Sequence, residues 1–213
     1  MSVRSWSYPA VLALVMVLGA FAPQAQAAGD AQRGKTLGYT CLGCHGVDAY
    51  RNAYPNYSVP KLAGQHPEYL VQALKAYRSG ERSHGTMHAH ASSMSDQDME
   101  DIAAYLSGSV ITATAGATPV GVAPAQVATC QACHGRDGVG IIGTYPTLSG
   151  QHADYLERAL SEYRSGGRRN GIMGPFVSTL KPEDIKAVAV YFSKQKPALQ
   201  TEYRQIFRFS SAK

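Results

Sequence analysis

The sequence predicts an all-α protein with two similar helical domains in tandem. Two observations carry this prediction: one half of the chain recurs in the other, and apolar residues in both halves follow a helical period. Segment 64–70 (Gly-Gln-His-Pro-Glu-Tyr-Leu) recurs at 150–156, and segment 77–82 (Tyr-Arg-Ser-Gly-Glu-Arg) recurs at 163–168. Both pairs are offset by 150 − 64 = 163 − 77 = 86 positions, which indicates a tandem duplication.

Each repeat contains two stretches with a helical period. In segments 69–77 and 155–163, apolar side chains recur at i, i+1, i+4, i+5 and i+8, as on one face of a helix. The later stretches carry apolar residues at Met99, Ile102, Ala103 and Leu106 and at Ile185, Val188, Ala189 and Phe192. Ser95 is expected to cap the first of these later helices, and Pro182 to begin the second. No stretch shows a convincing strand-like alternation.

The N-terminus and the junction between the repeats define the expected domain boundaries. Arg4, the apolar run 11–21 and Ala-Gln-Ala at 25–27 are typical of a secretory signal peptide with its cleavage site. The run is well short of the roughly 20 residues that span a bilayer. Residues 108–121 are rich in Gly, Ala and Thr and carry little charge, as in a linker. We therefore predict a signal peptide over 1–27, domain 1 over 28–107, a linker over 108–121 and domain 2 over 122–213.

All four cysteines lie in two Cys-x-x-Cys-His motifs. The motifs, at 41–45 and 130–134, are 130 − 41 = 89 positions apart, so the first repeat has three extra residues, which fall in 47–59. Two thiols with this spacing can each add to a vinyl group of a haem, while the following imidazole reaches the iron. We predict two covalently bound haem c groups, attached by Cys41, Cys44, Cys130 and Cys133 and ligated by His45 and His134.

Other uses of paired cysteines fit this sequence less well. An isolated Cys-x-x-Cys could be half of a zinc site, a redox dithiol or a structural disulfide. A four-thiolate zinc site would have to join Cys44 to Cys130 across helix-like sequence, and a redox dithiol does not require a histidine after both motifs. Export also agrees with haem attachment, because free thiol pairs tend to form disulfides in an oxidising compartment.

The register of the repeat selects candidates for the second axial ligand. Met173 is the only methionine of the second half, and Met87 lies 86 positions before it. We expect a turn-like stretch ahead of the last helix to present each thioether to the iron, which would close both haems to other ligands. The alternative is a bis-histidine scheme that uses His66 and His152.

The first half contains further sulfur and imidazole groups. Met94 and Met99 align with apolar residues of the second half and are interpreted as core residues. His84, His88 and His90 have no counterparts in the second half. We interpret them as part of a solvated surface loop, with ligand exchange at the first haem as the alternative.

The charge balance argues against a nucleic-acid partner. The chain has 20 basic and 15 acidic residues, so its formal charge is +5, or +4 without Arg4. Haem propionates would offset most of this excess. The basic residues are scattered rather than clustered, and no flavin or dinucleotide motif is present, so the chain alone is not expected to be a dehydrogenase.

Together these motifs resemble the dihaem cytochrome c4 family. The resemblance covers about residues 29–193 and rests on the haem motifs, the Pro-x-Leu-x-Gly-Gln-His and Tyr-Arg-Ser-Gly-x-Arg segments, and the register of Met87 and Met173. It implies an all-α fold of two tandem class I cytochrome c-like domains, each around one covalently bound haem. It also implies that each haem iron is ligated by a histidine and a methionine.

The resemblance further implies a support for each histidine ligand. The carbonyl groups of Pro60 and Pro146 would accept a hydrogen bond from Nδ1 of His45 and His134, which orients the imidazole. Pro146 follows its histidine by 146 − 134 = 12 positions and Pro60 by 60 − 45 = 15, so the first loop departs from the second.

The expected function is electron transfer rather than catalysis. The resemblance implies a periplasmic carrier that passes single electrons from a respiratory donor, such as a quinol-oxidising complex, to a terminal oxidase or reductase. Peripheral membrane association is a further option. The alternative is an electron-transfer subunit of an oxidoreductase complex, such as a flavocytochrome sulfide dehydrogenase, and a third class is a haem enzyme with one open iron, such as a peroxidase. The tail 201–213 is interpreted either as a docking element or as a packed terminus.

Overall fold

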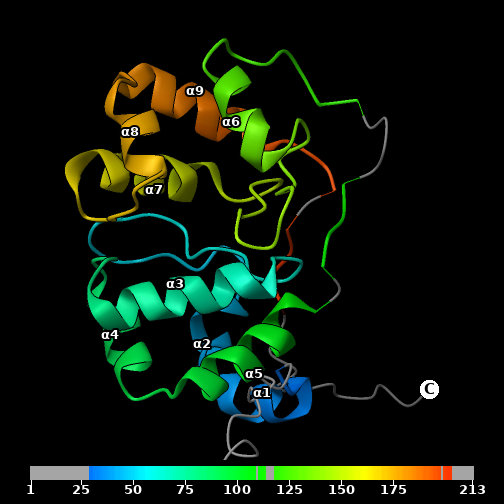
Figure 1. Ribbon diagram of the computed structural model, residues 1–213, viewed down its shortest axis with the longest axis vertical. Coiled ribbons are helices and arrows are strands. Elements are labelled where there is room, and N and C mark those ends of the chain that lie inside the picture. Colours follow the sequence, from blue (N-terminus) through cyan, green and yellow to red (C-terminus); the bar gives the residue numbers. More distant parts are fainter. Residues whose placement is uncertain (1–28, 109, 114–117, 198, 203–213) are drawn as a thin grey trace, which may run out of the picture.

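The computed structural model describes residues 29–108, 110–113, 118–197 and 199–202, so the predicted signal peptide and residues 203–213 lie outside the described part. Figure 1 shows the two halves stacked on one another, each a layer of helices. The elements are α1 (Ala31–Leu37), the short η1 (Gly38–Thr40), α2 (Leu42–His45), α3 (Pro67–Ser79), α4 (Gly85–Ser92), α5 (Asp96–Ser107), α6 (Val127–His134), α7 (Ala153–Ser165), α8 (Met173–Ser178) and α9 (Pro182–Ser193).

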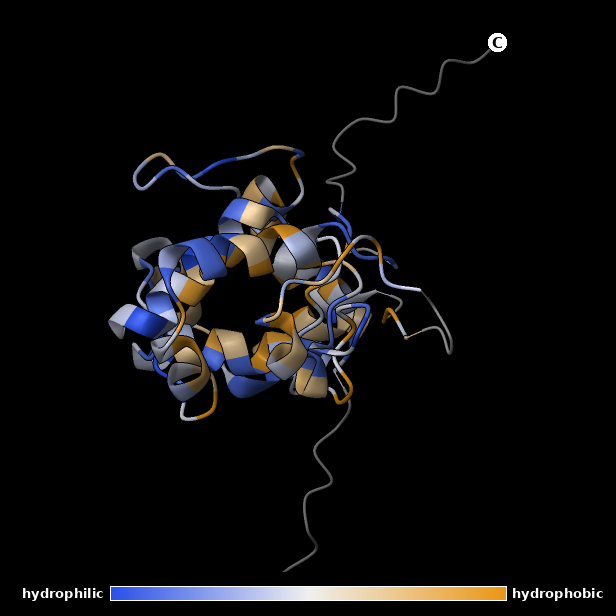
Figure 2. Ribbon diagram, turned by 90° about the horizontal axis from the view of Figure 1, so that it is seen from above, coloured by the Kyte–Doolittle hydropathy of each residue, from blue (hydrophilic) through white to orange (hydrophobic). Residues whose placement is uncertain are grey.

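The predicted all-α fold is confirmed, because the described residues form helices and only isolated β-bridges. None of the described helices combines the length and the apolar character needed to cross a membrane. Figure 2 shows the apolar segments of the helices turned mainly towards the interior and the hydrophilic segments turned outwards.

The equivalent helices α3 and α7 begin and end in the same way. Each follows an extended histidine, His66 or His152, and each ends at a left-handed glycine, Gly80 with φ 77° or Gly166 with φ 83°. A glycine adopts this conformation without steric cost and stops the helix. The two helices bury corresponding residues, Leu70 and Ala73 in α3 and Leu156 and Ala159 in α7.

The later helices α5 and α9 begin where the sequence predicted. Ser95 caps α5 in a capping box with Asp98, and Pro182 is the first residue of α9. Met99 of α5 and Ile185 of α9, which correspond in the repeat, are both buried. Each late helix packs against the long helix of its own half, α5 on α3 and α9 on α7, and closes the core of that half.

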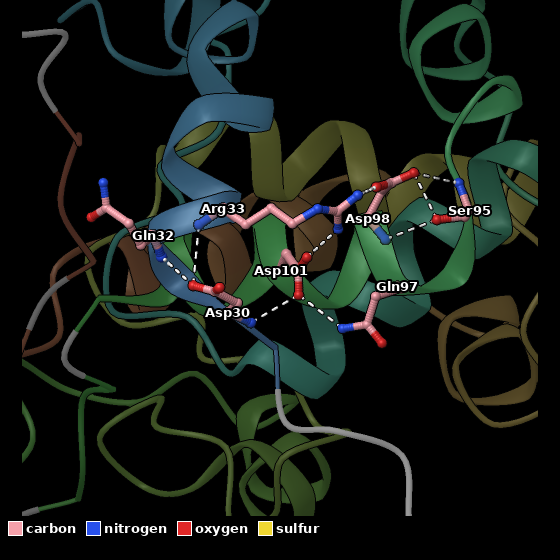
Figure 3. Close-up of polar contacts among 7 residues, drawn as sticks. All are labelled: Asp30, Gln32, Arg33, Ser95, Gln97, Asp98 and Asp101. Atoms are coloured by element: carbon pink, nitrogen blue, oxygen red, sulfur yellow. Dashed lines mark hydrogen bonds and ion pairs between the residues drawn. The ribbon is translucent and has the colours of Figure 1, made fainter. Parts of the chain in front are cut away.

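Helix α1 is held against α5 by the buried carboxylate of Asp101 (Figure 3). Oδ1 of Asp101 accepts hydrogen bonds from the backbone N–H of Asp30 at 2.8 Å and from Nε2 of Gln97 at 2.8 Å. Arg33 forms ion pairs with Asp98 and Asp101. This network attaches α1 to α5, the last helix of the first half.

The two halves are joined by backbone pairing as well as by side chains. Arg82 and Arg168, equivalent in the repeat, lie opposite one another in an isolated antiparallel bridge. Gln200, near the end of the chain, returns to the first half and pairs with Ala63 through two backbone hydrogen bonds of 3.0 and 3.1 Å. The segment around Gln200 therefore contacts domain 1, although the sequence assigned it to domain 2.

Candidate haem-binding sites

The second Cys-x-x-Cys-His motif lies on helix α6. Cys130 and Cys133 are three positions apart on this helix, so they occupy the same side, and His134 is its last residue. Gly135 ends the helix with φ 74°, a conformation that favours glycine. Nδ1 of His134 lies 2.8 Å from the carbonyl oxygen of Pro146. This bond leaves Nε2 as the nitrogen available to a metal.

A cavity of about 590 Å³ adjoins this motif. Cys130, Cys133, His134 and Met173, which the sequence assigned to one haem, all line it. The other lining residues include Leu148, Leu156, Leu160, Phe176, Val188 and Phe192. The volume lies within the range of cofactor pockets, and the apolar walls with attachment thiols on one side fit a flat, mostly apolar macrocycle. His152, the competing ligand, does not line this cavity.

Met173 is placed by a short helix rather than by a turn. The sequence predicted a turn-like stretch here, but Met173 is the first residue of α8. The side-chain oxygen of Asn170 accepts hydrogen bonds from the backbone N–H groups of Ile172 and Met173, both at 2.9 Å. N–H groups at the start of a helix have no acceptor within the helix, so the bonds to Asn170 stabilise the start of α8. Sequence reasoning missed the role of Asn170.

The first motif has the same local geometry. Cys44 and His45 lie on α2, and Cys41 immediately precedes this helix. Nδ1 of His45 lies 2.8 Å from the carbonyl oxygen of Pro60, the same distance as in the second half. The three extra residues of the first loop are absorbed between them, where Arg51 and Ser58 form an isolated bridge. The longer loop contacts the second half, where the Ser58 hydroxyl donates to Asp154 at 3.0 Å, and returns Pro60 to its histidine.

Met87 also lies on a helix. The sequence predicted that its histidine-rich neighbourhood forms a loop, but residues Gly85–Ser92 form α4. The side chain of His84 accepts the backbone N–H of Met87 and caps this helix. Met87 packs against the buried cluster that contains Tyr77 and Met99. The loop prediction was wrong because an imidazole can serve as the helix cap, a role usually filled by Ser, Thr, Asp or Asn.

The remaining histidines of the first half have local partners or face solvent. Nδ1 of His88 lies 2.8 Å from the carbonyl oxygen of Tyr77, and His90 is exposed. Nε2 of His66 lies 3.1 Å from the carbonyl oxygen of Gly140 in the other half. Among the described residues, no group of three or more His, Cys, Asp or Glu side chains is arranged to hold a metal ion.

The electrostatics of the two motifs suit neutral ligands. Burial lowers the pKa of both His45 and His134, and the hydrogen bonds to Pro60 and Pro146 partly offset this effect. Both rings are therefore neutral at neutral pH, as iron ligation requires. Burial raises the pKa of the Cys41 and Cys130 thiols, so both are protonated at neutral pH in the protein without a bound group.

Two buried arginines lie beside the cavity of the second half. Arg82 and Arg168 both line it, and each guanidinium lies over tyrosine rings of its own half at 5.2 to 5.8 Å. Arg168 also donates to Glu162 at 2.6 Å. The Arg82 guanidinium donates to the hydroxyl of Tyr69 at 2.8 Å. Positive charge at the edge of an apolar cavity suits the carboxylates of a haem.

Known proteins share this arrangement. The sequence pattern of the cytochrome c family matches residues 31–109 and 122–196. Cytochrome c4 of Pseudomonas aeruginosa is 34% identical over 197 residues, which cover 85% of this chain and 96% of that protein. A thiosulfate dehydrogenase electron acceptor of Stutzerimonas stutzeri is 33% identical over 210 residues, which cover 88% of this chain and 94% of that protein.

Solved structures give the same result. The crystal structure of reduced recombinant cytochrome c4 from Pseudomonas stutzeri has a TM-score of 0.61 and 33% identity, and the match covers 79% of this chain and 100% of that chain. A thiosulfate dehydrogenase from Marichromatium purpuratum has a TM-score of 0.61 and 28% identity, over 77% of this chain and 40% of that chain.

The fold, the paired haem motifs and these relatives define an electron-transfer protein with two covalently bound haem c groups. The chain belongs to the cytochrome c family and, within it, to the dihaem cytochrome c4 family. The sequence-based resemblance and the prediction of two haems are thereby confirmed.

Proposed function

We propose that the protein is a periplasmic electron carrier in which both haem irons are closed by a histidine and a methionine. The observation that carries this proposal is the cavity of the second half, which His134 and Met173 line together with both attachment cysteines. The repeat register extends the same assignment to His45 and Met87 in the first half. With two protein ligands, a haem bound at each motif would supply one-electron transfer and would offer no open position to a substrate.

The residues around each haem support this role. A bound haem c supplies reversible one-electron chemistry, and a methionine ligand raises its reduction potential. The apolar side chains of the cavity exclude water, and the Nδ1–H of each ligating histidine is held by a proline carbonyl. Arg82 and Arg168 would compensate the charge of haem carboxylates.

The proposed partners rest on the family resemblance. As a member of the cytochrome c4 family, the chain would take electrons from a respiratory donor, such as a quinol-oxidising complex, and pass them to a terminal oxidase or reductase. The predicted signal peptide over 1–27 supports export to the periplasm. Peripheral contact with the membrane would bring the carrier to such complexes.

The second candidate is an electron-transfer subunit or dedicated acceptor of a sulfur-oxidising enzyme. Two observations favour it: relatives from Stutzerimonas stutzeri and Thiomonas intermedia are named as electron acceptors of thiosulfate dehydrogenase, and a thiosulfate dehydrogenase matches in structure. Under this alternative, the electrons come from thiosulfate, rather than from sulfide as the sequence-based example supposed.

Carbon monoxide binding to the reduced protein at neutral pH tests the proposal. If both haems are closed, the absorption spectrum of the reduced protein should not change when carbon monoxide is added. Rapid stoichiometric binding of carbon monoxide at either haem would contradict a carrier with two methionine ligands. Purification from periplasmic and membrane fractions then separates the two candidates. A free dihaem protein reduced by membrane quinol supports the carrier, and stable co-purification with a thiosulfate-oxidising activity supports the subunit.

A further inference from the structure

Two equivalent glutamines cross the interface between the halves. Oε1 of Gln65 accepts the backbone N–H of Thr147 at 2.8 Å, and its Nε2 donates to the carbonyl oxygen of Thr147 at 2.9 Å. Gln151 forms the same pair of bonds with Lys61, at 3.0 and 2.9 Å. Both glutamine side chains are buried, with 4% of their surface exposed. Each half therefore binds both the backbone N–H and the backbone carbonyl of one residue in the other half.

The held segments are those that support the histidine ligands. The N–H of Thr147 belongs to the same peptide group as the carbonyl of Pro146, whose oxygen lies 2.8 Å from Nδ1 of His134. In the first half, the N–H of Lys61 and the carbonyl of Pro60 form one peptide group. A continuous hydrogen-bond chain thus runs from a glutamine oxygen through one peptide to the histidine of the opposite half.

Such a chain changes the character of the histidine as a ligand. A hydrogen bond accepted from a peptide N–H polarises the amide and makes its carbonyl oxygen a stronger acceptor. A stronger acceptor draws the Nδ1–H proton and makes the imidazole a more basic ligand. A more basic ligand stabilises ferric iron relative to ferrous iron, and hydrogen bonding around the ligands is one determinant of haem potential.

We propose that Gln65 and Gln151 are positioning residues, each of which lowers the reduction potential of the haem in the opposite half. Gln65 acts through Pro146 on the haem of His134, and Gln151 acts through Pro60 on the haem of His45. The proposal rests on the proposed iron ligation by these two histidines. It makes the potential of each haem depend on contact between the domains.

A purely structural role gives a different expectation. Oε1 of each glutamine also accepts the N–H of the following histidine, His66 at 3.0 Å or His152 at 3.1 Å, at the start of α3 and α7. If the glutamines only fastened these helix starts and the interface, replacing one would disturb its own half at least as much as the other. A larger effect on the haem of the opposite half therefore distinguishes the proposed role from a purely structural one.

The experiment uses the full-length, haem-loaded protein with the substitutions Gln65→Leu and Gln151→Leu. Redox titration followed by haem methyl NMR signals, assigned to each half, gives two midpoint potentials. In Gln65→Leu, the potential of the haem at His134 should rise by about 18 mV, which corresponds to a roughly twofold change in the ferric-to-ferrous ratio. The potential of the haem at His45 should change less. Gln151→Leu should give the mirror image.

The control is Ser58→Ala, which removes a 3.0 Å interdomain hydrogen bond from the Ser58 hydroxyl to Asp154 and leaves both glutamines in place. This substitution should not shift the midpoint potential of one haem more than that of the other. Three results in the glutamine variants would overturn the proposal: a potential shift only at the haem of the substituted half, equal potential shifts at both haems, or no potential shift. Should the leucine variants fail to fold, Gln→Met keeps the length of the side chain and removes the same acceptor.

The Nδ1–H proton signal of each ligating histidine gives a second readout, measured in the reduced, diamagnetic protein. It should move upfield for His134 in Gln65→Leu and for His45 in Gln151→Leu, because the bond to the proline carbonyl weakens. Unchanged signals would overturn the proposal. This readout is separate from the test of function: if carbon monoxide binds, the closed-carrier proposal fails, and the signals are then measured on the carbon monoxide adduct.

Discussion

Gly34 of α1 lies directly against the backbone of Asp101 of α5: a Cβ atom on Gly34 would be 1.8 Å from the carbonyl oxygen of Asp101. A backbone group at this distance cannot move aside as a flexible side chain does. The first helix can therefore approach the last helix of its domain only because residue 34 has no side chain. The ion pairs of Arg33 with Asp98 and Asp101 form at the same contact.

The substitution Gly34→Ala should separate α1 from α5. Overpacking of this kind costs about 3 kcal/mol of unfolding free energy, measured by urea denaturation of the haem-loaded protein. Gly85 in α4 is the matched control, because a Cβ there meets nothing within 4 Å. Gly85→Ala, at the exposed first residue of α4, should change stability by no more than about 0.5 kcal/mol. Equal effects of the two substitutions would contradict the close approach.

Asp101 should make stability depend on pH in the acid range. Burial alone raises the pKa of Asp101, but hydrogen bonds from the Asp30 N–H, Gln97 and Arg33 outweigh it and lower the pKa below the usual 3.8. A lowered carboxyl pKa gives stability that is present above about pH 4 and is lost as pH falls towards the folded-state pKa.

The substitution Asp101→Asn should therefore cost about 2 kcal/mol at pH 7, because it removes charged hydrogen bonds at a buried site. The difference from the unchanged protein should shrink as pH falls below about 4, because the unfolded chain then binds a proton at Asp101 that the folded protein takes up only at its lower pKa. Urea denaturation at a series of pH values measures it. A difference that stays constant down to pH 2 would show that the charge of Asp101 contributes nothing.

Removing Met173 should open the second haem alone. In Met173→Ala, the reduced protein should bind one carbon monoxide per chain, and the ferric sulfur-to-iron charge-transfer band should lose about half its intensity, because one of two methionine ligands remains. Met94→Leu is the control, since Met94 packs against the core clusters of the first half. Carbon monoxide binding in His152→Ala instead would favour the bis-histidine scheme.

Asn170 should stabilise the helix that presents Met173. The substitution Asn170→Ala leaves the N–H groups of Ile172 and Met173 without their acceptor, and loss of such a cap costs about 1 kcal/mol. Urea denaturation should show this loss, and carbon monoxide should bind weakly to the second haem, where the methionine is less firmly held. An unchanged midpoint and an unchanged spectrum would contradict this role.

The sequence located most of the helices but not all of their contacts. The repeat, the helical period of α3 and α7, and the starts of α5 and α9 at Ser95 and Pro182 are local features, and the structure has them as predicted. The stretches that carry Met87 and Met173 were expected to be irregular but form α4 and α8. Their starts are stabilised by His84, an unusual capping residue, and by Asn170, which lies three positions before the first residue of α8.

The sequence by itself determined the chemistry: the cysteine spacing with a following histidine requires no long-range information to identify two haem attachment sites. Only the tertiary structure decided what surrounds them. It brought Met173 to the cavity of His134 and joined Gln65 and Gln151 to the peptides behind the opposite histidines. The Gly-Gln-His repeat marked these glutamines, but their partners lie more than 80 positions away, and distant pairing depends on how the two domains pack.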